Sequence, residues 1–183
     1  MDKNDIGRNY KEQKIKKPSI ESVLNNLPDD KQKTAIDFYS FLRDLKMTPK
    51  WSSMNSFNFN YKNKRVCYIM AGDNADNLHI RLYTQYNKYF IEYFENKNMN
   101  DIILRTMVIC CNCNICKPGK TFEIFGKKIM NVCGCPSQVV LRMTNPNKEE
   151  LEYAKELVNY RRESIIEGRV PKHIYVKISD RKK

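Results

Sequence analysis

Six of the seven cysteines in this chain fall within one short window, from Cys110 to Cys135. The window reads Cys110-Cys111-Asn-Cys113-Asn-Ile-Cys116, and Cys133-Gly-Cys135 follows sixteen residues after Cys116. Two cysteines separated by two residues let one tight turn direct both sulfurs at one ion. Zinc takes four such thiolates in a tetrahedron at structural sites. The spacing therefore predicts a zinc knuckle that clips a loop to a hairpin.

The spacing leaves the ligand set and the metal open. One set combines Cys113 and Cys116 with Cys133 and Cys135, and the other replaces Cys135 by Cys110. Three cysteines spaced Cys-x-x-Cys-x-x-Cys, with a distant fourth before a proline, also suit a four-iron cluster. Redox-active or merely buried thiols are a further alternative.

The cellular compartment affects whether these cysteines form disulfides or bind a metal. The chain starts without an apolar stretch and has no run of about 18 apolar residues, so we expect a cytoplasmic protein. Thiols stay reduced there, and an odd cysteine count also argues against a disulfide framework. Cys67 lies in the middle of a predicted strand and is expected to be a small core residue.

Hydrophobic periodicity predicts an α+β fold. A short helix is expected between Pro18 and Pro28, and a longer one runs to about Lys46 with Asp29 and Asp30 as N-caps. Three strand segments then follow, the first and third with alternating apolar and polar residues, and because short turns connect them they must pair antiparallel as a meander. These predicted strands are Phe57–Tyr61, Arg65–Met70 and Leu78–Tyr83.

The second half adds helices, a hairpin and a further strand. Two helical pieces divided near residues 96–98 span Asn87–Ile109, and Asn147 with Glu150 forms a capping box for a last helix that ends at Gly168. We expect an antiparallel sheet of about five strands, with helices packed on one face. The added strands are Thr121–Phe125 and Lys128–Val132 of the hairpin, and Val139–Met143.

The net charge of +12 is concentrated at the two ends. Residues 1–17 carry six basic and three acidic side chains, and residues 169–183 carry six basic and one acidic. We expect a disordered or loosely held arm over 1–17 and one domain over 18–168 with its zinc knuckle at 110–135. Residues 169–183 are expected to form a basic tail, with an additional edge strand over His173–Ile178.

Several short pieces of the segment from Phe41 to Glu163 form one pattern. They include Lys64-Arg65-Val66-Cys67-Tyr68-Ile69, Lys117-Pro118-Gly119, Ile124-Phe125-Gly126-Lys127, Asn131-Val132-Cys133 and Asn145-Pro146. This pattern resembles a family of small bacterial proteins, mainly from Gram-positive anaerobes, with no assigned activity. The resemblance implies Cys133 as the fourth ligand beside Cys110, Cys113 and Cys116. A helix, a meander and a closing helix are also remotely similar to YdhG/YjbR-like domains, which lends no mechanism.

No catalytic motif is present in the sequence. We expect a zinc-containing binding protein without enzymatic activity, whose ligand is a small molecule or a protein. The alternatives are a nucleic-acid-associated protein that uses its basic tails, and a thiol or iron–sulfur redox protein. Aromatic strand residues could line a ligand pocket, stack single-stranded bases or form a plain core. The candidate ligand-binding residues are Trp51, Tyr61, Tyr68, His79, Arg81 and Tyr83.

Overall fold

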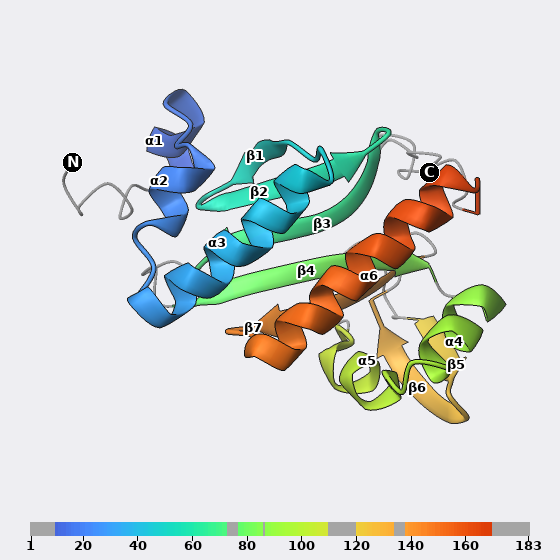
Figure 1. The fold of residues 1–183 in the computed structure, drawn as a ribbon. Helices are drawn as coiled ribbons and strands as arrows, with labels where there is room; N and C mark the ends of the chain where they lie inside the picture. The colour runs from blue at the N-terminus through green and yellow to red at the C-terminus, as the bar shows by residue number, and fades with distance from the viewer. Residues whose placement is uncertain (1–9, 73–76, 86, 110–119, 134–137, 170–183) are drawn as a thin grey trace, which may run out of the picture.

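A five-stranded antiparallel sheet in the order β1-β2-β3-β4-β7 organises the fold, and a separate two-stranded sheet pairs β5 with β6 (Figure 1). The computed structural model describes residues 10–72, 77–85, 87–109, 120–133 and 138–169. The predicted α+β class and antiparallel sheet are confirmed. The strands are β1 (Pro49–Ser53), β2 (Ser56–Tyr61), β3 (Lys64–Ala71), β4 (Leu78–Gln85), β5 (Lys120–Ile124), β6 (Lys127–Val132) and β7 (Gln138–Thr144).

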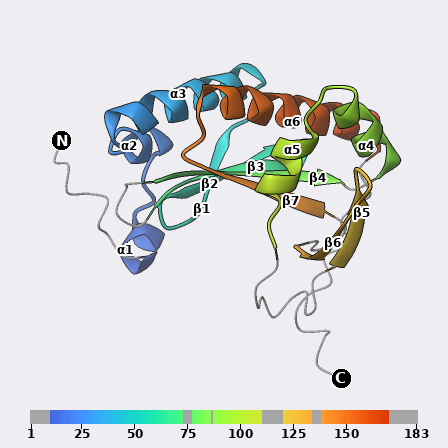
Figure 2. The same cartoon turned by 90° about the horizontal axis from the view of Figure 1, so that it is seen from below.

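Helices α3 and α6 lie side by side over one face of the five-stranded sheet, and α6 contacts β3 and β4 (Figure 2). Helix α1 lies elsewhere, against the edge strand β1. Among the described residues, no helix has the length and apolarity needed to cross a membrane. The helices are α1 (Tyr10–Ile15), α2 (Ile20–Leu24), α3 (Asp29–Asp44), α4 (Lys88–Glu95), α5 (Asn100–Thr106) and α6 (Lys148–Ile166).

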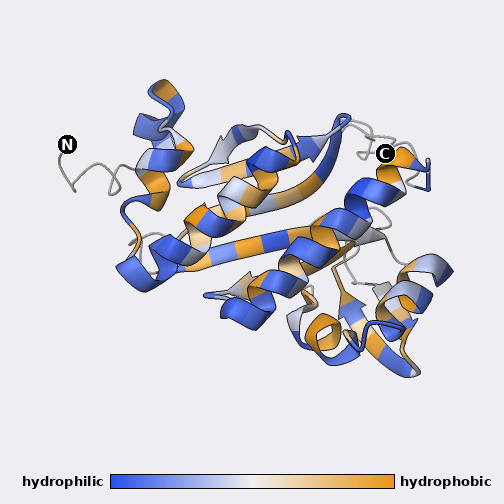
Figure 3. Cartoon of the chain, in the orientation of Figure 1, coloured by the Kyte–Doolittle hydropathy of each residue, from blue (hydrophilic) through white to orange (hydrophobic). Residues whose placement is uncertain are grey.

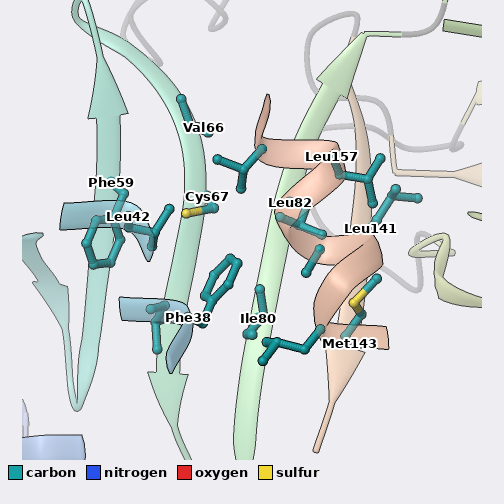
Figure 4. Packing of buried hydrophobic residues seen from close by; sticks show 14 of the residues in the cluster. Phe38, Leu42, Phe59, Val66, Cys67, Ile80, Leu82, Leu141, Met143 and Leu157 are labelled. Atoms are coloured by element: carbon teal, nitrogen blue, oxygen red, sulfur yellow. The ribbon is translucent and has the colours of Figure 1, made fainter. Parts of the chain in front are cut away.

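The main core fills the space between the helical layer and the sheet. Strand β4 alternates between apolar and polar residues along its length (Figure 3), and its apolar side chains are fully buried. Side chains from α3, α6 and three strands meet in this layer, as Figure 4 shows for Phe38, Leu42, Cys67, Ile80, Leu82, Leu141 and Leu157. Because strand side chains alternate between faces, His79, Arg81 and Tyr83 of β4 must point away from the helices, whereas Thr84 lies on the buried face.

Local signals explain most helix ends. Asn147 and Glu150 form the predicted capping box at the start of α6, and Gly168 after its end has a φ of 72°, which glycine adopts without strain. The predicted N-cap role of Asp29 and Asp30 is wrong. Pro28 occupies the N-cap without a side-chain bond, so both carboxylates lie in the first turn, where they stabilise the positive end of the helix dipole.

Two elements were not predicted. Helix α1 falls within the stretch expected to be a loosely held arm, and β1 falls in a stretch without clear alternation. Buried Gln13 of α1 donates a 2.6 Å hydrogen bond to Asn55 Oδ1 and accepts a 2.8 Å bond from the Asn55 backbone N–H. This reciprocal pair fixes α1 to the turn between β1 and β2. The predicted strand at 173–178 and most of the cysteine window lie outside the described residues.

Candidate functional site

The cysteine window lies mostly outside the residues that the structure describes, because only Cys67 and Cys133 belong to the described ranges. Cys67 is fully buried in β3, as predicted, and burial raises the pKa of its thiol. Cys133 is partly exposed just after β6. Within the described ranges, no group of three or more histidine, cysteine or acidic side chains could hold a metal ion.

The structure nevertheless brings together the three points at which the cysteine-bearing segments join the described chain. Ile109 forms an antiparallel bridge with Val132, and Val132 also pairs with Lys120 in the hairpin. The Cys133 backbone N–H donates a 2.8 Å bond to the Val108 carbonyl. Adjacent strands lie about 4.8 Å apart, so residues 109 and 120 flank Val132 within about 10 Å of each other.

This junction is attached to the main sheet. Met107 bridges Leu141 of β7, and the Val108 N–H donates a 2.9 Å bond to the Val140 carbonyl. Residues 107–109 therefore connect β7 on one side with β6 on the other. The helical stretch predicted to reach Ile109 ends instead at Thr106, because the following residues pair as extended chain.

Four of the six candidate ligand residues gather on the sheet face opposite α3 and α6. His79, Arg81 and Tyr83 alternate with the buried Leu78, Ile80 and Leu82 along β4. Tyr68 of β3 lies directly opposite Arg81. We call this the open face, and it comprises the outward residues of β1–β4 and β7, namely Lys50, Asn58, Arg65, Tyr68, Met70, His79, Arg81, Tyr83, Val140, Arg142 and Thr144.

The remaining two candidates lie elsewhere. Tyr61 shares the helix-facing side of β2 with buried Phe57 and Phe59, and the Arg162 guanidinium of α6 lies 5.2 Å from its ring centroid. Trp51 of β1 stacks on Tyr10 of α1 with ring centroids 6.1 Å apart. The structure therefore does not place either residue with the open-face group.

Arginine–aromatic pairs order the open face. The Arg81 guanidinium lies 5.3 Å from the Tyr68 ring centroid, and that of Arg65 lies 5.1 Å from the Tyr83 ring. Such contacts contribute about 0.5–1 kcal/mol at exposed sites. His79 Nδ1 is 2.9 Å from the Thr144 hydroxyl on the neighbouring strand, a cross-strand contact that fixes the imidazole.

Five open-face positions form one straight row across the whole sheet. Sequence reasoning identified only two members of this row, Tyr68 and Arg81. Arg142 alternates with buried residues of β7, which is a usable signal, but its place beside Arg81 depends on the pairing of β4 with β7. In register across β1, β2, β3, β4 and β7, the row is Lys50, Asn58, Tyr68, Arg81 and Arg142.

A buried arginine on the opposite side of the sheet was also missed. Arg161 of α6 is 1 % exposed, and its Nε donates a 3.3 Å bond to the Arg65 carbonyl. Burial lowers its pKa to about 10, with Tyr160 opposing the change. Arg161 follows Val158 by three residues and precedes Ile165 by four, so helical spacing alone places it on the core face.

Comparisons of this chain with protein-family models, curated proteins and solved structures give no match. The resemblance drawn from its sequence motifs therefore stays a prediction, and the functional argument depends on the geometry of the cysteine junction and the open face.

Proposed function

We propose that this chain is a zinc-containing, non-enzymatic binding protein that holds an anionic small molecule on the open face. The zinc ligands in this proposal are Cys110, Cys113, Cys116 and Cys133, with Cys135 as the alternative fourth ligand. Thiolates of this kind persist in a reducing compartment, so we place the protein in the cytoplasm. A four-iron cluster is the alternative cofactor.

The convergence at Val132 is the observation that carries the metal proposal. Ile109 immediately precedes the first cysteine segment, and Cys133 immediately follows Val132 in the chain. Because Ile109 and Val132 pair directly, the first and last proposed ligands are attached to neighbouring backbone positions. Consecutive Cα atoms are about 3.8 Å apart, so Cys110 and Cys133 are each one residue away from this antiparallel pair, in opposite directions along the chain.

The ligand proposal is supported by two unsatisfied polar atoms on the open face. Arg81 Nε and Asn58 Oδ1 are buried and have no hydrogen-bond partner in the described part of the chain. They belong to the same cross-strand row on either side of Tyr68. A buried polar atom left unpaired costs about 1–3 kcal/mol. A ligand that accepts from Arg81 and donates to Asn58 would remove this cost.

Elemental analysis of the full chain, purified without chelators, tests the metal proposal. We expect about one zinc per chain, and Cys116→Ser should lower both the zinc content and the melting midpoint. Cys67→Ser is the matched control, because it changes a buried cysteine of the core and should lower stability at constant zinc content. Protein without stoichiometric metal, or brown protein with iron–sulfur absorption, would contradict the proposal.

Metal removal provides a second readout at described residues. The Cys133 amide hydrogen is bonded to the Val108 carbonyl, so its exchange with solvent reports on the junction. We expect a chelator to accelerate exchange at Cys133 much more than at Leu82 in the centre of the sheet. Equal acceleration at both positions would show global unfolding, and no change at Cys133 would argue against a metal at this junction.

A further inference from the structure

The two layers of the fold differ in charge. The five strands of the main sheet contain five lysines or arginines and no aspartate or glutamate. Helix α3 carries three basic and four acidic side chains, and α6 carries four basic and five acidic, so each helix has a net charge of −1. Of these two layers, it is therefore the sheet that carries the net positive charge.

Most of this sheet charge lies on the open face. Lys50, Arg81 and Arg142 occupy the cross-strand row, and Arg65 extends the group along β3. The row crosses all five strands, and a strand spacing of about 4.8 Å gives it a length of about 19 Å. A small anion would contact only one or two of these cations, whereas an extended polyanion can contact them all.

The aromatic residues of the open face add a second kind of contact. Tyr83 is partly exposed and lies two residues beyond Arg81 along β4. Tyr68, opposite Arg81, is only 9 % exposed, so Tyr83 offers the ring on which a base can stack. Base stacking on aromatic side chains combined with backbone contacts to basic groups is how sequence-tolerant single-strand binders work.

The unsatisfied atoms fit a nucleobase. Arg81 Nε needs an acceptor and Asn58 Oδ1 needs a donor, and both kinds of group lie on the edge of a base. An acidic peptide offers carboxylate acceptors and backbone donors, but its acidic side chains have no flat ring to stack on Tyr83. A lipid headgroup offers acceptors without a base edge. Charge, length and aromatic content together favour a nucleic acid over these two polyanions.

We propose that the open face binds single-stranded nucleic acid across the row Lys50, Asn58, Tyr68, Arg81 and Arg142. This inference rests on the proposed role of the open face in ligand binding and deepens it: the anionic small molecule is a nucleotide, and a single strand occupies the row with consecutive nucleotides. Phosphates contact the row cations, and a base stacks on the partly exposed Tyr83. The interaction belongs to the sheet and does not require the basic ends of the chain.

Fluorescence anisotropy with a labelled twelve-nucleotide oligo-uridine and the full chain tests the proposal. Arg81→Gln should weaken binding by about tenfold or more, since a stacked or phosphate-bound contact contributes about 1–3 kcal/mol. It should also lower the steepness of the salt dependence by about one. Arg43→Gln is the matched control, because Arg43 lies 5.9 Å from the Tyr39 ring on α3 and has the same charge. It should change the affinity less than twofold.

Tyr83→Leu tests stacking, with Tyr83→Phe as its conservative partner. Leucine should weaken binding of oligo-uridine at least fivefold, whereas phenylalanine should retain it. An abasic strand of equal charge should bind wild type about as weakly as oligo-uridine binds Tyr83→Leu. A variant qualifies for comparison when its melting midpoint lies within about 2 °C of wild type, which for a chain of this size corresponds to about 1 kcal/mol or less.

The remaining outcomes separate this inference from the proposed function. One outcome is that uridine monophosphate binds, that Arg81→Gln abolishes this binding, and that the oligomer binds no more tightly than the monophosphate. It would overturn the single-strand inference and leave the small-molecule proposal standing. If Arg81→Gln leaves the affinity for the oligomer unchanged, the oligomer binds to other parts of the chain and the inference is overturned. Equal competition by polyglutamate of matched charge would also overturn it. Failure of both the monomer and the oligomer to bind would overturn both.

Discussion

Replacement of Arg161 by methionine should stabilise the protein. The guanidinium is 1 % exposed, and Nη1 and Nη2 have no hydrogen-bond partner in the ranges that the structure describes. Buried arginines are normally paired with a carboxylate, and an uncompensated buried charge is strongly unfavourable. Methionine has a similar length and a flexible apolar side chain, so it can fill the same space between α6 and β3 without a charge.

The pKa of Arg161 gives the magnitude. Burial lowers it from an ordinary value of 12.5 to about 10. At about 1.4 kcal/mol per pKa unit, the folded state disfavours the charged form by about 3–4 kcal/mol. The penalty is fully present at neutral pH, because the side chain is protonated in both states, and it is relieved only above pH 10. Loss of the bond to the Arg65 carbonyl offsets about 1 kcal/mol.

We therefore expect Arg161→Met to raise the free energy of unfolding by about 1–3 kcal/mol at pH 7. Urea unfolding should show a higher midpoint with an unchanged slope, at zinc content equal to wild type. Arg162→Met is the control, since Arg162 contacts the Tyr61 ring and should lose up to about 1 kcal/mol. Destabilisation of Arg161→Met by more than 1 kcal/mol would show that the guanidinium has a binding partner in the folded protein, and would refute the reasoning.

Three further predictions concern the core, the N-terminal helix and pH. Leu157→Ala should cost about 2–5 kcal/mol in urea unfolding, because Leu157 is 1 % exposed between α6 and the sheet; an unchanged midpoint would contradict the packing of α6. Gln13→Ala should cost about 1–3 kcal/mol and change the fluorescence of the single tryptophan, since two bonds to Asn55 are lost. The Tyr39 hydroxyl is the main cause of a lowered pKa at Glu21, so this contact stabilises the fold above about pH 4.5 and is lost as the pH falls through the lowered value. Tyr39→Phe should therefore reduce the difference in unfolding free energy between pH 7 and pH 3. The reduction should be less than about 1 kcal/mol because Glu21 is exposed. An unaltered difference would contradict the role of this bond.

Local patterns predicted the elements whose burial is regular. The alternation along Leu78–Tyr83 and the spacing of Leu151, Ala154, Leu157 and Val158 each report directly on one buried face, and both elements form as predicted. The short turn at Lys62-Asn63 was equally visible, and both residues adopt the positive φ that closes such a turn. These signals depend only on neighbours in the sequence, which is why sequence reasoning recovers them.

Elements that long-range contacts stabilise were not predicted. Helix α1 has one buried residue, Gln13, and its partner Asn55 is 42 positions away. No local sequence pattern predicts a pair of polar residues so far apart in the chain. Strand β1 is short and half-exposed, and it exists because β2 offers an edge with which Trp51 and its neighbours pair. Arg161 was missed for a different reason, because its charge suggested a solvated position although its spacing indicated the core.

The position of β7 links the two candidate sites. Its outer residues place Arg142 beside Arg81 and Val140 beside Tyr83, which completes the open-face row. Its other edge receives the Val108 N–H at the Val140 carbonyl, which anchors the cysteine junction. Both sites thus depend on one strand that pairs with β4 across more than fifty intervening positions. A metal that fixes the junction would also fix the edge of the open face, so the proposed zinc would influence the proposed ligand face without contacting a ligand there. Structural zinc in this place would then hold β7 in register. This role would explain why a chain whose sheet and helices already supply a large core would bind a metal.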